Sequence, residues 1–197
     1  MAQTTDKPKG RVLIIAGSDS GGGAGIQADI KTVSALGGYA MTAITAVTVQ
    51  NTLGVTGVHA VPPDIVRAQI EAVMGDLGAD TWKIGMMGSA DHVRAALEAW
   101  YAVGAGAPVI LDPVMIAKGG ASLLNEDAIE VIRDELMPIA AMVTPNAPEA
   151  EALTGVADAT ASAQWFVVAG TLAALPRPTF FAAAALCFDA KAPDEVR

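Results

Sequence analysis

Short apolar runs alternate along this chain with segments in which apolar residues recur every three or four positions. The run RVLIIAG at 11–17 is apolar, rich in β-branched residues and closed by glycine, which is typical of a buried parallel strand. The residues Ile26, Ile30, Val33 and Leu36 then mark one face of a helix. The alternation predicts strands at 11–17, 39–50, 81–85, 108–112 and 140–144. It predicts helices at 26–36, at 66–77 with entry through Pro62-Pro63-Asp64, at 93–101, at 126–136 and from Pro148 onward.

This order predicts an α/β protein with a mostly parallel central sheet, right-handed crossovers and helices on both faces, which is a three-layer α/β/α arrangement. The stretch 52–61 does not fit the alternation, and we interpret it as a β excursion at the sheet edge. The 197 residues suit one domain, and the sequence shows no internal repeat and no linker between two domains.

The amino-acid composition limits which classes of binding partner and which cellular compartment suit this chain. The formal charge of −9 argues against nucleic acid or an anionic membrane surface, because both reward clustered Lys and Arg. It leaves room for a nucleotide, since backbone N–H groups bind phosphate without net positive charge. Cys187 is the one cysteine, so we expect a reducing compartment. Without an apolar leader or a run of about 20 apolar residues, we expect a cytoplasmic protein that does not span a membrane.

A short polar or glycine-containing segment stands at the end of each of five predicted strands, and we call such a segment a corner. The carboxyl ends of parallel strands meet at one edge of the sheet, which is where such proteins bind ligands. Each corner taken alone is also an ordinary turn, but five at one edge favour a site. The corners are Gly17-Ser18-Asp19, Gln50-Asn51, Gly85-Met86, Asp112-Pro113 and Thr144-Pro145-Asn146.

The glycine-rich turn at 17–25 (GSDSGGGAG) is the strongest single feature. Its glycines let the backbone approach a ligand closely, and the helix that follows favours an anion or acceptor at its N-terminus. The segment 23–28 also matches G-x-G-x-x-A, but a dinucleotide site wants an acidic residue where Gln50 and Asn51 stand. It is not a P-loop either, because no Gly-Lys-Ser/Thr follows.

Two residues near this turn have open interpretations. Asp29 is either a pocket residue or a solvent-facing acid of the first helical turns, favoured by the helix dipole. Gln50 shares a strand face with Thr48 and offers a planar heterocycle both a donor and an acceptor, although an isolated strand-end glutamine is more often an ordinary edge residue.

Four segments, taken in order, resemble the bacterial hydroxymethylpyrimidine/phosphomethylpyrimidine kinases of thiamine biosynthesis, which are members of the ribokinase-like superfamily. The resemblance covers about residues 11–158, roughly three quarters of the chain. The segments are AGSDSGGGAGIQADIKTVSALGGYAMTAITAVTVQNT from Ala16, KIGMMGS from Lys83, LDPVMIAKGG from Leu111 and VTPNAPEAEALTG from Val143.

The resemblance implies a ribokinase-like, Rossmann-like fold and ATP-dependent phosphorylation of 4-amino-5-hydroxymethyl-2-methylpyrimidine and of its monophosphate. It also implies a homodimer. It places the pyrimidine pocket at Gly17, Ala24, Asp29, Gln50, Met86 and Val114. It places nucleotide binding at Asn146 and Mg²⁺ at Glu149, with Asp112 nearby; Glu149 alternatively serves as a first-turn acid of the helix after Pro148.

The resemblance ends near Asp158. Members of the family continue with a Lys-Gly-Gly-type strand and a Gly-Thr-Gly-Cys-like loop that carries the anion hole and the catalytic base. Neither motif occurs here, and Cys187 has no glycine beside it. We therefore predict a disordered N-terminal tail (1–10), an incomplete kinase domain (11–158) and a divergent tail (159–197), such as a frameshifted or truncated gene produces, and we assign no catalytic base.

Three functions are consistent with these features. The first is a hydroxymethylpyrimidine kinase by descent with impaired catalysis. The second is a related kinase for another heterocyclic alcohol such as pyridoxal, against which Gln50 argues modestly. The third is a pyrimidine-binding remnant that transfers nothing.

Overall fold

The computed structural model describes residues 8–104, 106–115, 124 and 126–156. Most of the predicted N-terminal tail (1–10) and all of the predicted divergent tail (159–197) lie outside these residues. Among the described helices, none is both long enough and apolar enough to cross a membrane.

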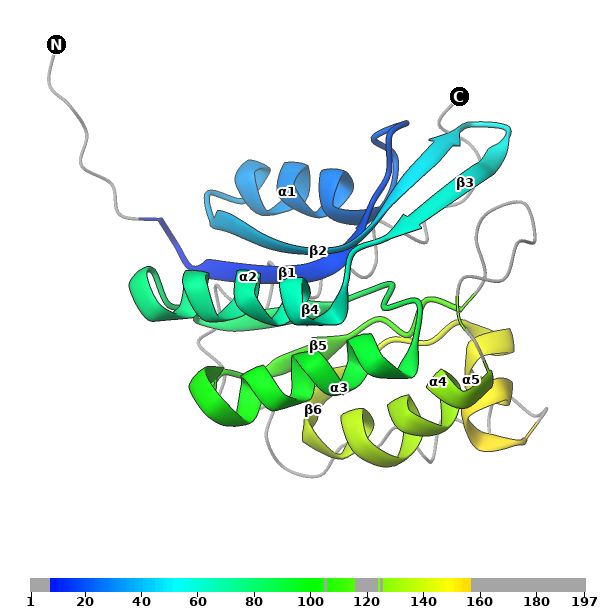
Figure 1. The fold of residues 1–197 in the computed structure, drawn as a ribbon. Helices are drawn as coiled ribbons and strands as arrows, with labels where there is room; N and C mark the ends of the chain where they lie inside the picture. The colour runs from blue at the N-terminus through cyan, green and yellow to red at the C-terminus, as the bar shows by residue number, and fades with distance from the viewer. Residues whose placement is uncertain (1–7, 105, 116–123, 125, 157–197) are drawn as a thin grey trace, which may run out of the picture.

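A six-stranded sheet in the order β3-β2-β1-β4-β5-β6 forms the centre of the described structure (Figure 1). Every neighbouring pair is parallel except β2 and β3, which form an antiparallel hairpin at one edge. The predicted β excursion at 52–61 is therefore confirmed as an edge strand. The strands are β1 (Arg11–Ser18), β2 (Tyr39–Asn51), β3 (Gly54–Ala60), β4 (Thr81–Ile84), β5 (Val109–Leu111) and β6 (Ala140–Val143).

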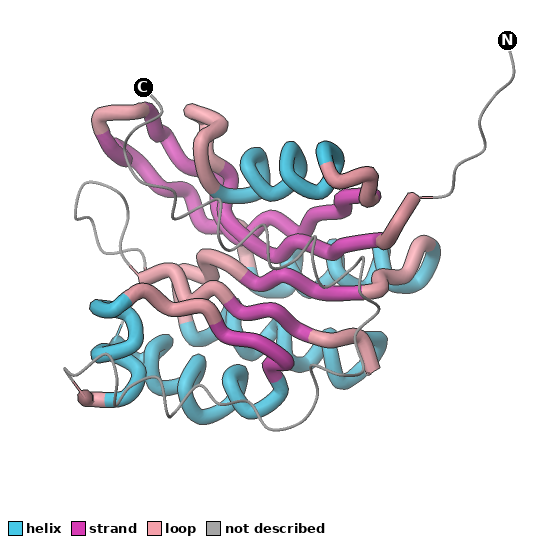
Figure 2. The backbone as a smooth tube through the Cα atoms, turned by 180° about the vertical axis from the view of Figure 1, so that it is seen from behind, coloured by secondary structure: helices cyan, strands magenta, loops and turns pink. Residues whose placement is uncertain are grey.

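Helices cover both faces of the sheet, as Figures 1 and 2 show from opposite sides. On one face, α1 packs against β1 and β2; on the other lie α2, α3 and α4. The predicted α/β/α layering is thus confirmed. The helices are α1 (Gly25–Ala35), α2 (Pro63–Asp76), α3 (Ala90–Ala99), α4 (Glu126–Val131) and α5 (Ala147–Thr154).

Alternation along β1 divides the core into two layers. Leu13 and Ile15 join the large apolar cluster beneath α2, α3 and α4. Val12 and Ile14 face the opposite way and pack with Val33 of α1. All five side chains are fully buried, and each large buried aliphatic side chain contributes about 1.5–3 kcal/mol through removal from water. Burial on both faces therefore fixes the register of the sheet.

Two predicted helices differ in extent from the observed ones. The helix predicted at 93–101 begins earlier, at Ala90, because the Ser89 side chain caps it by accepting a hydrogen bond from the His92 backbone N–H. The helix predicted at 126–136 is α-helical only to Val131 and then continues as a π-helical turn and a short 3₁₀ turn.

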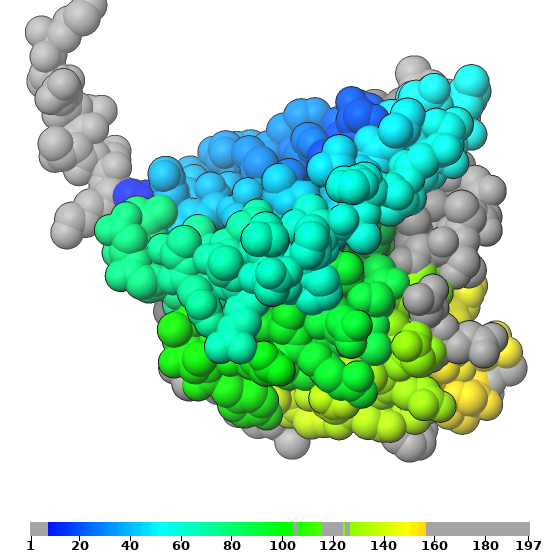
Figure 3. Space-filling model, in the orientation of Figure 1, coloured from blue at the N-terminus to red at the C-terminus, as the bar shows by residue number. Residues whose placement is uncertain are grey.

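The β2–β3 hairpin extends beyond the body of the molecule (Figures 1 and 3). Its pairing shifts between Val49 and Gln50, which bends the strand where the hairpin passes the glycine-rich turn. Val49, Leu53 and Val58 expose more than half of their surface there. The hairpin therefore presents apolar side chains to solvent next to Gln50.

Candidate functional site

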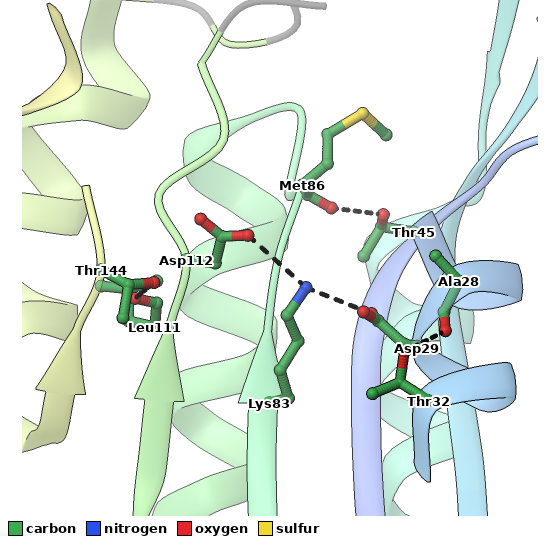
Figure 4. A network of polar contacts seen from close by, with 9 residues as sticks. All are labelled: Ala28, Asp29, Thr32, Thr45, Lys83, Met86, Leu111, Asp112 and Thr144. Atoms are coloured by element: carbon green, nitrogen blue, oxygen red, sulfur yellow. Dashed lines mark hydrogen bonds and ion pairs between the residues drawn. The ribbon is translucent and has the colours of Figure 1, made fainter. Parts of the chain in front are cut away.

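The five predicted corners follow the carboxyl ends of β1, β2, β4, β5 and β6. These strands are parallel, so the corners lie at one edge of the sheet, as predicted. Within this edge, Thr48 of β2 contacts the Ser18 carbonyl of β1 and the Gln50 side chain. Lys83 of β4 and Asp112 after β5 lie beside Asp29 of α1 (Figure 4). The structure thus brings residues from four sheet strands and α1 to one corner of the molecule.

The Asp19 carboxylate organises the glycine-rich turn from within. Its Oδ1 accepts from the Gly21 N–H at 2.8 Å, and its Oδ2 accepts from Gly23 and Ala24 at 2.9 and 2.8 Å. Asp19 is only 6% exposed. We expected the amides of this turn to face an anionic or acceptor ligand, but three of them bind the protein's own carboxylate. The turn therefore has a fixed shape before any ligand arrives.

We expect Asp19→Ala to destabilise the protein by about 2–4 kcal/mol, because three partly buried N–H groups lose a charged acceptor together. Equilibrium unfolding in urea measures this loss. Asp64→Ala is the matched control: Asp64 is an exposed first-turn acid of α2, worth at most about 1 kcal/mol. Equal losses for the two variants would show that Asp19 does not organise the turn.

Hydrogen bonds from the turn hold Gln50 in place. Ser20 Oγ accepts from the Gln50 N–H at 2.8 Å and donates to the Gln50 carbonyl at 2.6 Å. Thr48 Oγ1 lies 3.2 Å from the Gln50 side-chain amide, which confirms that the two side chains share a face. The predicted pocket residue Gln50 is thus anchored at its backbone and is partly exposed.

Gly17 and Met86 are packed against each other at the floor of this corner. A Cβ added to Gly17 would collide with the terminal methyl of Met86, so a larger residue here would displace the Met86 side chain. The Met86 carbonyl accepts a 2.7 Å hydrogen bond from the buried Thr45 hydroxyl, which ties the corner after β4 to β2 (Figure 4). The structure therefore brings two of the predicted pocket residues into direct contact. Ala24 is the N-cap of α1, above the same turn.

A buried lysine lies between two buried carboxylates. Lys83 Nζ donates to Asp29 Oδ2 at 3.1 Å and is 3.8 Å from Asp112 Oδ2, and each of the three side chains is 4% exposed or less. Figure 4 shows Lys83 pointing from β4 between α1 and the corner after β5. The solvent-facing interpretation of Asp29 is wrong, because the helix turns that side chain onto the sheet, where Lys83 meets it.

Burial and charge act against each other at Asp29. Burial raises the pKa of the Asp29 carboxyl above its ordinary value, the neighbouring Lys83 ammonium lowers that pKa, and the Asp112 carboxylate raises it again. Two carboxylates share one ammonium, so the cluster has one negative charge in excess when all three groups are ionised. Such a cluster is suited to the approach of a cation or of a hydrogen-bond donor.

The corner after β5 is a tight turn. The Val114 N–H donates to the Asp112 carbonyl at 2.8 Å, and the Asp112 N–H donates to Ile84 in β4. Asp112 is thereby fixed to the neighbouring strand, whereas Val114 is partly exposed two residues further on. This places Val114 at the same edge of the sheet as the other predicted pocket residues.

Asn146 and Glu149 form a capping box at the start of α5. The Asn146 side chain accepts from the Glu149 N–H at 2.9 Å, and Glu149 Oε2 accepts from the Asn146 N–H at 2.8 Å. The first-turn interpretation of Glu149 is therefore confirmed. It does not exclude a second role, because a carboxylate has further lone pairs and Glu149 is 6% exposed at this edge.

Mg²⁺ suits this donor set only as a metal shared with phosphate. The described residues contain no group of three or more His, Cys, Asp or Glu side chains that would enclose a metal ion. Mg²⁺, however, normally takes one or two carboxylates and completes its shell with phosphate oxygens and water. Asp112 and Glu149 are two buried carboxylates that follow the neighbouring strands β5 and β6, which is the kind and number of protein ligand that this arrangement uses.

The sequence reasoning gave no role to three residues of this corner. Lys83 stands in the strand TWKI, and a lysine inside a short buried strand is a signal in itself, since lysine is rarely buried without a partner. Asp19 precedes glycines, where Asp commonly binds the following N–H groups. Thr45 gives no such signal, because threonine is ordinary in a strand.

The fold and the site define a Rossmann-like α/β protein with a candidate ligand site at the carboxyl edge of its sheet. The chain belongs to the phosphomethylpyrimidine kinase family, whose model matches residues 19–177. This match confirms the resemblance drawn from the four sequence segments and runs past Asp158, where we placed the end of that resemblance.

Individual proteins that are similar to this chain belong to the same family. A hydroxymethylpyrimidine/phosphomethylpyrimidine kinase of Bacillus subtilis is 53% identical over 146 residues, which are 74% of this chain and 54% of the relative. The crystal structure of a phosphomethylpyrimidine kinase from Clostridium difficile is 44% identical with a TM-score of 0.72, over 79% of this chain and 67% of that one.

A more distant structure is that of the Staphylococcus aureus pyridoxal kinase in complex with AMP-PCP and pyridoxal. It is 32% identical with a TM-score of 0.64, over 92% of this chain and 59% of that one. The predicted ribokinase-like fold is thus confirmed by kinases of both kinds. The chain spans 30% to 54% of the length of the first curated relatives that it matches.

Proposed function

We propose that this chain carries the pyrimidine-binding body of a hydroxymethylpyrimidine/phosphomethylpyrimidine kinase, an enzyme of thiamine biosynthesis. The reaction transfers a phosphoryl group from ATP to the hydroxymethyl group of 4-amino-5-hydroxymethyl-2-methylpyrimidine and then to its monophosphate. The observation that carries this proposal is the anchoring of Gln50 beside a preformed glycine-rich turn, in a chain of this family.

The geometry supports a planar, polar and uncharged heterocycle. Gln50 supplies one amide, with a donor and an acceptor, for the ring edge. Gly17 and Met86 form a floor with no polar side chain, on which a ring lies flat. Ala24 and Val114 flank the same edge with small or apolar side chains, and Asp29 brings a buried carboxylate toward it. These are the six residues of the predicted pocket.

ATP and Mg²⁺ are the cofactors that we propose. Phosphoryl transfer depends on positioning and on neutralising phosphate charge. Asp112 and Glu149 would hold the metal, whose chemistry is to neutralise phosphate oxygens as the bond to the leaving group breaks. Asn146, the N-cap of α5, would lie on the nucleotide side of the site. Structures of related pyridoxal kinases with AMP-PCP support the use of ATP.

We further propose a cytoplasmic enzyme that acts on a small molecule and forms a homodimer. ATP-dependent biosynthesis belongs where ATP and the pyrimidine are made, and the formal charge of −9 disfavours nucleic acid as a partner. The exposed Val49, Leu53 and Val58 of the β2–β3 hairpin are consistent with contact to a second copy of the chain.

Pyridoxal is the second candidate substrate, because pyridoxal kinases share the fold at 31–34% identity. The curated pyrimidine kinases are 48–53% identical, which favours the pyrimidine. A pyrimidine-binding protein without transfer is the third candidate.

Calorimetric titration tests the proposal. We expect 4-amino-5-hydroxymethyl-2-methylpyrimidine to bind at least about tenfold more tightly than pyridoxal, and Gln50→Leu to weaken its binding by about tenfold or more, since one or two hydrogen bonds are lost. ADP release with ATP and Mg²⁺ is measured in parallel. Binding without turnover selects the third candidate, and turnover with pyridoxal alone selects the second. No binding of either compound would refute the proposal.

A further inference from the structure

The Thr48 hydroxyl faces two acceptors with one hydrogen to donate. Thr48 is 5% exposed, and its Oγ1 lies 2.8 Å from the Ser18 carbonyl oxygen and 3.2 Å from Gln50 Oε1. A hydroxyl carries a single hydrogen. The 2.8 Å contact has the ideal length for an O–H···O bond, whereas 3.2 Å is long for one, so the hydrogen belongs to Ser18.

Two oxygen atoms would then face each other at Gln50 without a hydrogen between them. A half-turn of the amide about its last side-chain bond exchanges Oε1 and Nε2, which occupy nearly the same space, and the hydrogen-bond network decides between the two orientations. With Nε2 toward Thr48, one amide N–H donates to the lone pairs of Oγ1. The Thr48 hydroxyl, the Ser18 carbonyl and the amide N–H that faces Thr48 then all have partners.

We propose that Thr48 is a specificity-determining residue that holds the Gln50 amide with its nitrogen toward Thr48 and its carbonyl oxygen on the opposite side. The second N–H and the carbonyl oxygen are then presented to the ligand side by side and in a fixed order. The inference rests on the proposed function and extends it by naming the residue that sets this order.

The fixed order selects one kind of ring edge. An aminopyrimidine offers an amino donor beside a ring-nitrogen acceptor, and an amide in one orientation matches both, as glutamine matches adenine. The corresponding pyrimidinone offers a carbonyl acceptor beside a ring N–H donor, which is the reverse order. When the 5-hydroxymethyl group points to the site of phosphoryl transfer, the ring is held one way round, and the pyrimidinone then matches only the opposite amide orientation. Thr48 thus favours the 4-amino over the 4-oxo ring.

Hydrogen bonds anchor both partners of the contact between Thr48 and Gln50. Ser20 Oγ holds both the N–H and the carbonyl of Gln50, and Thr48 is held to β1 through Ser18. The position of the Gln50 Cα atom and that of the Thr48 hydroxyl are therefore both fixed. The hydroxyl then controls which way round the amide lies.

The test compares two ligands across three variants by calorimetry. The ligands are 4-amino-5-hydroxymethyl-2-methylpyrimidine and its 4-oxo counterpart. Thr48→Val removes the hydroxyl at nearly constant shape, and we expect the Kd ratio between the ligands to fall by about tenfold. Thr48→Ser keeps the hydroxyl and should keep the ratio. Thr56→Val is the matched control, because Thr56 is exposed on β3 and its hydroxyl contacts only the Val49 carbonyl among the described partners.

A second measurement uses the wild-type protein, so that a folding defect of Thr48→Val cannot obscure the result. Strong nuclear Overhauser contacts between the Gln50 side-chain NH₂ and the Thr48 methyl group are expected only when Nε2 faces Thr48. An unchanged Kd ratio in folded Thr48→Val, or the absence of these contacts, would overturn the inference. Failure of the wild type to bind either ligand instead refutes the proposed function, and the NMR contacts still decide the orientation.

Discussion

Lys83→Met is expected to lower the free energy of unfolding by about 3–5 kcal/mol, measured by urea denaturation at neutral pH. The substitution leaves Asp29 and Asp112 buried without the ammonium that lies 3.1 and 3.8 Å from them. Removing one member of a buried charge cluster costs this much because the remaining charges keep their desolvation penalty and lose their compensation.

The loss in Lys83→Met should grow with pH. In the wild type, burial already raises the pKa of Asp29, and Lys83 opposes that shift. Without Lys83 this pKa rises further above its unfolded value, so the folded state binds more protons than the unfolded state as pH rises above about 4. Stability present at acid pH is then lost as pH rises through the folded pKa. We therefore expect wild type and variant to be closest in stability at acid pH.

Two comparisons isolate the charge effect. Lys83→Met combined with Asp29→Asn removes a cation and an anion together and should recover part of the loss. Lys31→Met is the matched control, because Lys31 is an exposed α1 lysine that donates to the Gly22 carbonyl, and its loss should stay within about 1 kcal/mol. A loss below 1 kcal/mol for Lys83→Met itself would contradict a paired, buried lysine.

Gly25→Ala is expected to destabilise the protein by about 2–5 kcal/mol and to abolish tight pyrimidine binding. Gly25 has a φ of +56°, which costs an L-residue about 1–2 kcal/mol. An added Cβ would also collide with the Gly17 carbonyl oxygen and lie 3.3 Å from the Asp19 nitrogen. Both are backbone atoms of the preformed turn, so the turn itself must move, at a further cost of about 1–3 kcal/mol.

Gly75→Ala is the matched control, and we expect it to change the stability in the opposite direction. Gly75 lies in the last turn of α2, and an added Cβ there meets no atom within 4 Å. Alanine in a helix is favoured over glycine by up to about 1 kcal/mol, so this variant should be neutral or more stable than the wild type. If Gly25→Ala behaved like Gly75→Ala, the turn before α1 would have to be adaptable rather than preformed.

Most of the element order was predictable because each element has a local cause. The β-branched run at 11–17 indicates a strand, and the glycines at 37–38 indicate the end of a helix. Neither signal depends on the rest of the fold. The edge strand at 54–60 was predictable as an exception to the alternation. Helix ends were less accurate: Ser89 caps α3 through a short-range contact that the apolar periodicity does not contain.

The site was only partly predictable. Motifs identify Gln50, Gly17 and Met86 together, and the structure brings them to one corner. The glycine-rich turn looked available to a ligand anion, yet Asp19 occupies its amides. Asp29 had two open interpretations in the sequence, because helical position alone does not say which neighbour a side chain meets.

The sequence by itself determined the alternating α/β order, the corner positions and the family, since periodicity, turn residues and motif spacing are local properties. Only the tertiary structure decided which charges meet. Lys83 and Asp29 are 54 residues apart, and Thr48 and Ser18 are 30 apart. Their pairing depends on which strands become neighbours in the sheet and on which face each residue points to. Burial then gives those contacts their energy, because a charge or a hydroxyl removed from water must find its partner within the protein.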